Sequence, residues 1–260
     1  MDRFFRVEID RDGSSPAPQR ACWRGMHVCM AEGFAYDDKV PVEAKAGEYT
    51  IKNAINYEHF SVFRPAYLVL HAQGFPHSVV SQITRHQDSA FLVQSMRYTG
   101  DRIAAFGQKL TEFEVFNYTD LNNNPNHVQL FNGLWELFYY RNVGEHYTNR
   151  QGKKYIYSER SYNSLIDKNI NACIDYYLDI EDGMSEEHAR EGLTYNFRQN
   201  FMVAGDLQAI LHFMDQRSKA DSQLEIRKFA EHAMAKVKEF APEFAEWYMS
   251  KRYGRARLAP

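Results

Sequence analysis

The sequence predicts an α+β protein, because strand-like and helical patterns both recur along its 260 residues. Residues 4–9 alternate as a strand does, and residues 66–72 form a short apolar strand that we expect Gly74 and Pro76 to end. The Tyr-rich residues 139–157 have the pattern of two strands that flank a polar turn, which predicts a protruding hairpin.

Several segments have helical character. Residues 40–57 and 77–85 have helical spacing, and residues 197–234 are predicted as strongly helical. Ser185 is a predicted N-cap, because two glutamates follow it in the first turn of a helix. An apolar helical stripe, more typical of a core than of a cofactor site, consists of Ile166, Ile170, Cys173, Ile174 and Tyr177.

Composition limits the classes of partner. Hydrophobic residues make up 44% of the chain and aromatic residues 15%, which is enough for a large core. The net charge of −3 provides no field that would recruit nucleic acid, and no apolar run reaches the roughly 18 residues of a membrane span. The first residues lack the pattern of a signal peptide, so we expect a soluble, cytoplasmic protein.

The three cysteines predict reduced thiols and no metal site. An odd number of cysteines without a Cys-x-x-Cys pair argues against a disulfide framework. Cys22, His27 and Cys29 could in principle ligate a metal, but no second half-site is visible. We therefore expect no metal.

The most polar stretch of the chain is residues 82–98, which follows the second predicted strand. It contains two guanidiniums, an imidazole and three side-chain amides. Such groups suit an anion that carries a polar ring, because arginine binds phosphate with two parallel hydrogen bonds. Taken alone, the segment is better explained as a solvated turn.

Three further blocks have the same chemical character. Residues 56–61 precede the second strand, and residues 187–190 read Glu-His-Ala-Arg, which puts Arg190 on an early helical turn. Arg217 lies in the middle of a predicted long helix and is followed by Ser-Gln-Leu-Glu-Ile at residues 222–226.

Together these blocks resemble the flavin-dependent thymidylate synthases. The signature of that family is Arg-His-Arg, seven residues, and Ser-x-Arg-Tyr. Here residues 85–87 read Arg-His-Gln, seven residues follow, and residues 95–98 read Ser-Met-Arg-Tyr. The resemblance extends from about residue 54 to residue 230.

The resemblance implies a nucleotide site. By analogy Arg217 is catalytic, because a guanidinium in a dry pocket stabilises the charge that builds on the uracil oxygens. Ser95 is assigned to the catalytic set with Arg217, as a binding hydroxyl rather than a nucleophile, since no base partner is evident. Arg97 and Arg190 are expected to hold the phosphate. The complete predicted substrate set is Gln82, Arg85, Gln94, Ser95, Arg97, Arg190 and Arg217.

The resemblance also implies an FAD site, formed by His59, Ser61, Arg85, His86, Gln87, Asp206, Gln208, His212 and Asp221. Gln87 stands where the signature has its second Arg. On the predicted long helix, four positions that carry Asn, Arg, Asn and His in relatives are occupied by Asp206, Gln208, His212 and Asp221. Two lost guanidiniums and two new carboxylates predict weaker binding of the FAD pyrophosphate, with Arg64 restoring one charge.

For activity, the resemblance implies methylation of uracil C5 in dUMP. Methylenetetrahydrofolate would donate the carbon, FAD the hydride, and NADPH would re-reduce the flavin. Two alternatives stay open: a relative that methylates UMP in a nucleoside-antibiotic pathway, and a nucleotide-binding homologue without catalysis. An unrelated α+β domain is disfavoured by the ordered blocks.

For architecture, the resemblance implies a central, mostly antiparallel sheet flanked by long helices. It also implies a homotetramer whose sites are shared between subunits. We expect residues 1–260 to form a single domain, of which residues 1–50 fit the family poorly.

Overall fold

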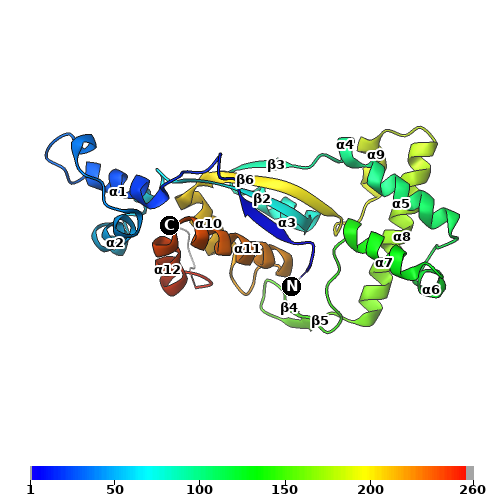
Figure 1. Cartoon of the computed structure of the whole chain (residues 1–260). Helices are drawn as coiled ribbons and strands as arrows, with labels where there is room; N and C mark the ends of the chain where they lie inside the picture. Colours follow the sequence, from blue (N-terminus) through cyan, green and yellow to red (C-terminus); the bar gives the residue numbers. More distant parts are fainter. Residues whose placement is uncertain (1, 256–260) are drawn as a thin grey trace.

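A four-stranded antiparallel sheet forms the centre of the fold (Figure 1). The computed structural model describes residues 2–255. The sheet order is β1-β2-β6-β3, and every neighbouring pair is antiparallel. This arrangement confirms the predicted α+β class. The strands are β1 (Arg6–Ile9), β2 (Tyr67–Pro76), β3 (Ala90–Val93) and β6 (Arg198–Asp206).

Helices extend the molecule beyond both ends of the sheet. Figure 1 shows α1 and α2 at one end and α4 to α9 at the other, with α10 to α12 beside the sheet. The helices are α1 (Pro18–Val28), α2 (Glu43–Asn53), α3 (His77–Ile83), α4 (Met96–Thr99), α5 (Asp101–Glu112), α6 (Tyr118–Asn123), α7 (His127–Leu137), α8 (Glu159–Glu181), α9 (Glu186–Ala189), α10 (Leu207–Arg217), α11 (Leu224–Phe240) and α12 (Pro242–Lys251).

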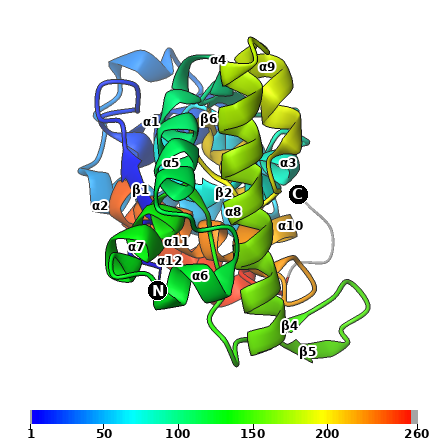
Figure 2. The same cartoon turned by 90° about the vertical axis from the view of Figure 1, so that its right-hand side faces the viewer.

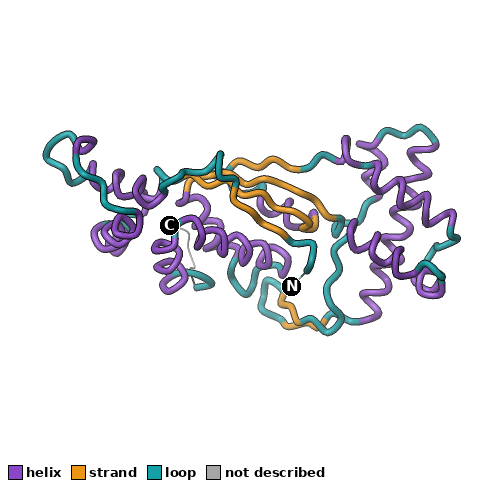
Figure 3. Tube along the Cα trace, in the orientation of Figure 1, coloured by secondary structure: helices purple, strands orange, loops and turns teal. Residues whose placement is uncertain are grey.

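One face of the sheet is buried by α10 and α11, and the strands form a separate layer above these helices in Figure 3. Phe229 of α11 meets Phe75 of β2 and Phe201 of β6 edge to face, at ring-centroid distances of 5.3 and 5.2 Å. All three rings are buried, and such pairs are favourable beyond the area that they bury. The opposite face exposes polar side chains such as His71.

A second hydrophobic cluster lies among α5, α7 and α8, which stand together in Figure 2. Helices α5 and α8 approach closely because Gly107 faces the carbonyl oxygen of Cys173, where a Cβ would be only 2.0 Å away. The predicted apolar stripe of α8 is confirmed: Cys173 and its three isoleucines are buried here, and Tyr177 is half-buried. Residues 2–255 therefore form two hydrophobic clusters, and the single domain stays a prediction.

The prediction that residues 197–234 are helical throughout is wrong for its first part. Residues 198–206 form the strand β6, which lies between β2 and β3. Most of its residues are buried, so its apolar run lacks the alternation that identifies a half-buried strand. Helices α10 and α11 occupy the remainder, interrupted by a loop at residues 218–223.

The second strand also runs further than predicted. β2 continues through Gly74 and Pro76, which the sequence suggested as its end. The pairing register shifts between Ala72 and Phe75, and Gly74 adopts a φ of 80° there, which a side chain would strain. Gly74 therefore marks an irregularity inside the strand, and Pro76 takes the last position of the ladder.

Other local predictions are confirmed. Helices α2 and α3 lie within the predicted ranges, and the hairpin consists of β4 (His146–Thr148) and β5 (Lys154–Ile156). Its turn is stabilised by Asn149, whose Oδ1 accepts the backbone N–H groups of Gln151 and Lys153. Ser185 takes the N-cap position of α9, but its hydroxyl contacts His188 Nδ1 at 2.8 Å instead of a backbone N–H.

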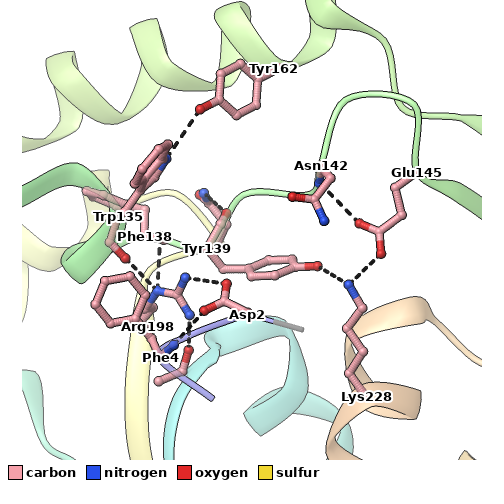
Figure 4. Close-up of polar contacts among 12 residues, drawn as sticks. Asp2, Phe4, Trp135, Phe138, Tyr139, Asn142, Glu145, Tyr162, Arg198 and Lys228 are labelled. Atoms are coloured by element: carbon pink, nitrogen blue, oxygen red, sulfur yellow. Dashed lines mark hydrogen bonds and ion pairs between the residues drawn. The ribbon is translucent and has the colours of Figure 1, made fainter. Parts of the chain in front are cut away.

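Arg198, the first residue of β6, joins the two hydrophobic clusters (Figure 4). Its Nη2 donates to Asp2 Oδ2 at 2.6 Å, and its Nη1 donates to the carbonyl oxygen of Gly74 at 2.5 Å. Its Nε lies 2.8 Å from the carbonyl oxygen of Trp135 and 3.1 Å from that of Phe138, at the end of α7. The guanidinium thus holds the N-terminal segment, β2 and the helical cluster together.

Two further observations concern the part of the chain that the structure describes. Among residues 2–255 no helix is both long and apolar enough to cross a membrane. No three metal-ligating side chains converge within the same residues. Cys22 and Cys29 do not meet His27 at a common point: Cys22 is buried, Cys29 is exposed, and His27 Nε2 contacts Asp38 at 2.6 Å.

We expect the Arg198→Met variant to lose roughly 3–5 kcal/mol of unfolding free energy, because Asp2 and three carbonyls would lose their buried donor. Chemical denaturation of the purified variant measures the loss. Arg6→Met is the control, since Arg6 is exposed and pairs with Glu8 at the surface, where a change of about 0.5 kcal/mol is usual. Equal losses in the two variants would contradict the role assigned to Arg198.

Candidate active site

Arg217 brings predicted residues together into a first group, the Arg217 group (Gln82, Arg85, His86 and Arg217). Its Nε donates to His86 Nε2 at 3.0 Å, and its Nη2 donates to the carbonyl oxygen of Gln82 at 3.3 Å. Burial, and then the nearby positive charge of Arg85, lower the pKa of Arg217. The guanidinium is therefore half-buried and fixed in place by two hydrogen bonds.

His86 is neutral in this arrangement. Burial lowers the pKa of His86 from 6.5 to about 4, and the positive charge of Arg217 adds to the effect. A neutral Nε2 can accept the proton that Arg217 donates, which an imidazolium could not do. The His86 ring also packs edge-on against Phe213 of α10, at 5.0 Å between centroids.

Ser95, Arg97 and Arg190 lie in a second group, the Arg97 group, which Glu187 holds together. Arg97 Nε is 3.7 Å from Glu187 Oε2, and Arg190 Nε donates to the carbonyl oxygen of Glu187 at 3.2 Å. Both arginines are exposed. Ser95 takes the N-cap position of α4, two residues before Arg97. Two exposed guanidiniums provide suitable donors for a phosphate.

The two groups lie at opposite ends of β3. His86 precedes the strand, whereas Ser95 and Arg97 follow it toward α4 (Figure 1). The four strand residues extend over about 10 Å at roughly 3.3 Å for each step. Gln94 is fixed between them, because its backbone N–H and its Oε1 both bond to the backbone of Asn200 in β6. Within one chain the predicted nucleotide residues therefore do not converge on one point.

Several predicted flavin residues share one face of α10. Gln208 and His212 are one turn apart, and Arg64 donates from its Nε to Gln208 Oε1 at 2.9 Å. The ring of His212 stands perpendicular to that of His86, at 6.4 Å between centroids. A polar strip therefore runs from Arg64 along α10 to His86 and Arg217.

The structure corrects several positions that the sequence placed on helices. Arg217 is the last residue of α10, not a mid-helix residue, and Arg190 follows the four-residue helix α9. Asp221 lies in the loop after α10, not on a helix. Asp206 ends β6 and caps α10, where its carboxylate accepts the backbone N–H of Ala209 at 2.8 Å. This carboxylate has a structural role as the cap of α10. It should therefore weaken the binding of a pyrophosphate less than the sequence suggested.

The other predicted flavin residues are exposed. His59 and Ser61 lie in two short 3₁₀ segments, Ile55–Tyr57 and Phe60–Phe63, or between them. Gln87 is exposed in the turn between α3 and β3. These positions are accessible to a ligand, but the described side chains do not join them to the polar strip.

Sequence reasoning missed two residues that organise the groups. Glu187 joins Arg97 to Arg190, and Gln223 Oε1 accepts from Gln82 Nε2 at 2.8 Å. Both belong to blocks that the sequence had already singled out, the Glu-His-Ala-Arg and Ser-Gln-Leu-Glu-Ile segments. Proximity to predicted ligand residues was the only signal.

Comparison with known proteins identifies the family. The sequence model of the family described as thymidylate synthase complementing protein matches residues 13–243, which is most of the chain. The chain belongs to this family. Flavin-dependent thymidylate synthases of Haloarcula marismortui and Halobacterium salinarum are 26% and 24% identical to it, over 216 and 205 residues. These matches cover 82% and 78% of this chain, and 80% and 75% of the relatives. The predicted family and enzyme type are thus confirmed.

Solved structures have the same fold. A UMP/dUMP methylase from Streptomyces cacaoi, bound with 5-Br dUMP, aligns over 98% of this chain and 97% of its own, with a TM-score of 0.69 at 18% identity. A thymidylate synthase from Helicobacter pylori, solved with FAD and dUMP, aligns over 88% and 92%, with a TM-score of 0.63 at 14% identity. At these identities the likeness concerns the fold.

The low pKa of His86 predicts a pH-dependent stability. Between pH 6.5 and 4 the unfolded chain protonates His86 and the folded chain does not, so the unfolding free energy falls as the pH is lowered through this range. We expect the His86→Gln variant to show a shallower fall, measured by denaturation at a series of pH values. His146→Gln, at an exposed position, controls for the loss of a histidine. Identical slopes for wild type and His86→Gln would contradict the assignment.

Proposed function

We propose that the chain catalyses the reductive C5-methylation of a uridine nucleotide, with dUMP as substrate and dTMP as product. Methylenetetrahydrofolate would supply the carbon and NADPH the reducing equivalents. The observation that carries the proposal is the half-buried Arg217, which His86 and Gln82 hold in one orientation. A preorganised cation of this kind stabilises charge that develops in a transition state.

Arg217 is suited to face the uracil ring. Its two hydrogen bonds use Nε and Nη2, so Nη1 stays available for a ring oxygen. Withdrawal of negative charge onto that oxygen makes uracil C5 nucleophilic enough to attack a one-carbon unit. Because His86 is neutral, it adds no charge that would weaken the attraction between Arg217 and the ligand. Its hydrogen bond keeps the guanidinium of Arg217 in one orientation.

Arg97, Arg190 and Ser95 are suited to hold the nucleotide phosphate and ribose. Glu187 orients both guanidiniums through different atoms, its carboxylate and its carbonyl oxygen, and leaves them exposed. An arriving phosphate dianion would compete with the carboxylate of Glu187 for Arg97, over a distance that is already long for an ion pair at 3.7 Å.

The separation of the two groups supports a homo-oligomeric enzyme, with the homotetramer of the family as the proposed state. If one subunit supplies Arg217 and another supplies Arg97 and Arg190, both ends of a nucleotide can be bound at once. A cytoplasmic location stays part of this proposal.

The residues of the polar strip fit FAD. Arg64 is exposed and uses its Nε for Gln208, which leaves its terminal nitrogens for a pyrophosphate. The carboxylate of Asp206 accepts a backbone N–H at the start of α10. It therefore repels a pyrophosphate less than an unpaired carboxylate would. When bound, FAD would supply the hydride chemistry. Arg64, His86, Gln208 and His212 are the residues that we assign to hold it.

UMP is the second candidate substrate. The structure of the Streptomyces cacaoi UMP/dUMP methylase aligns over 98% of this chain, whereas that of the Helicobacter pylori thymidylate synthase aligns over 88%. A catalytically inactive nucleotide-binding homologue is the remaining alternative.

One paired assay tests the proposal. Purified protein with FAD, NADPH and methylenetetrahydrofolate is given 5-tritiated dUMP or 5-tritiated UMP, and tritium release is measured. Release from dUMP above that from UMP supports the proposal, and the reverse order favours the second candidate. Flavin uptake without bleaching by NADPH and without tritium release would identify an inactive homologue.

We expect the Gln87→Arg variant to bind FAD several-fold more tightly, because it would return a cation to the turn beside the polar strip. Quenching of flavin fluorescence during titration measures the affinity. Gln108→Arg, on the exposed face of α5, adds the same charge elsewhere. Unchanged affinity in Gln87→Arg, or equal tightening in the control, would show that Gln87 does not face the flavin.

A shared site predicts complementation between inactive variants. Arg217→Ala and Arg97→Ala should each lose turnover, but co-refolded mixtures should regain up to about a quarter of wild-type activity, because some sites then combine two intact groups. A mixture of Arg217→Ala with Gln82→Ala is the control, since both residues belong to the same group. If the first mixture stays as inactive as the control, each site lies within one subunit.

A further inference from the structure

A pocket of about 410 Å³ lies next to the Arg217 group and has no role in the proposed reaction. It is enclosed by the first turn of α3, the middle of α8, the start of α11 and the segments that flank the hairpin. Its volume is within the range of roughly 300–1,000 Å³ that is usual for small-molecule sites.

The pocket combines aromatic walls with polar groups. Tyr157 and Tyr195 line it, and the Tyr195 ring is held edge-on against His77 at 5.0 Å between centroids. Ser78 and Asn196 also line the pocket. Tyrosine rings next to hydrogen-bonding groups suit a ligand with a flat ring and polar substituents.

Two cations belong to the same lining. Arg141 Nε donates to the buried Glu225 at 2.7 Å, which leaves four of its five N–H donors for other partners. Lys168, on the exposed side of α8, forms no ion pair among the described residues. Because Glu225 offsets one of the two charges, the pocket keeps a net positive charge that favours an anion.

A chain of hydrogen bonds connects the pocket to the Arg217 group. Glu225 accepts from Gln223 Nε2 at 2.8 Å, and Gln223 Oε1 accepts from Gln82 Nε2 at 2.8 Å. The carbonyl oxygen of Gln82 accepts in turn from Arg217. The hairpin beside the pocket is also attached to the loop after α10, because Thr148 Oγ1 donates to the carbonyl oxygen of Ala220 at 2.6 Å.

We infer that this pocket binds the ring-bearing anionic part of a second small molecule, next to the nucleotide. The shared chemistry is a flat ring with carboxylates or a phosphate, in contact with Lys168, Arg141 and Tyr195. One source, which rests on the proposed function, is the benzoyl-glutamate tail of the folate co-substrate. The other is the phosphate and base of a second nucleotide.

Calorimetric titration of the full-length protein tests the inference. The probes are p-aminobenzoyl-glutamate on the wild type, and UMP on the Arg97→Ala/Arg217→Ala double variant, in which both groups of the proposed nucleotide site are altered. Each titration is repeated on a protein that also carries the Lys168→Glu substitution. Lys238→Glu is the matched control, because it reverses the charge of an exposed helical lysine outside the pocket.

We expect Lys168→Glu to weaken binding of one probe by about tenfold or more and Lys238→Glu to leave it within about twofold. The probe that responds identifies the source of the ligand. Absence of binding by both probes, or an equal effect of the two lysine variants, would overturn the inference. The titration contains no flavin and measures no turnover, so its result is independent of the proposed reaction. A catalytically inactive protein can still bind a probe, and an active enzyme can bind neither.

Discussion

The buried guanidinium of Arg198 is the interaction on which the arrangement of the whole molecule depends. Its four N–H contacts reach the N-terminal segment through Asp2, the strand β2 through Gly74, and the end of α7 through Trp135 and Phe138. Without it, the three carbonyl oxygens and the carboxylate of Asp2 would lose this donor. Because the helical cluster has its own hydrophobic core, this contact sets how that cluster meets the sheet.

The antiparallel sheet then decides how the active site is divided. β3 carries the chain from the Arg217 group to the Arg97 group in an extended conformation, and its pairing with β6 fixes its direction. An extended strand cannot fold back within four residues, so the two groups stay apart in one chain. Under the proposed function, a nucleotide that contacts both groups would be bound between subunits, so the direction of β3 supports the proposed oligomer.

The departures from the family pattern look different in three dimensions. Asp206 stands where the resemblance places an amide, and its carboxylate caps α10, as aspartate commonly does at a helix start. Gln208 stands where the resemblance places a guanidinium, and it binds Arg64, a guanidinium from another element, on the polar strip. His212 also lies on that strip, beside His86. Gln87 and Asp221 are exposed and have no such counterpart among the described residues. These positions support an altered flavin site as part of the proposed function.

The sequence by itself determined the family and most local elements, because these depend on short-range spacing. It failed where tertiary contacts decide: residues 198–206, which contain the apolar run 201–205, form the strand β6, since burial within a sheet removes the alternation that marks a strand. Gly74 and Pro76 were accommodated inside β2 by a shift in register. Glu187 and Gln223, and the division of the site into two groups, appear only in three dimensions, because they depend on which distant segments the sheet brings together.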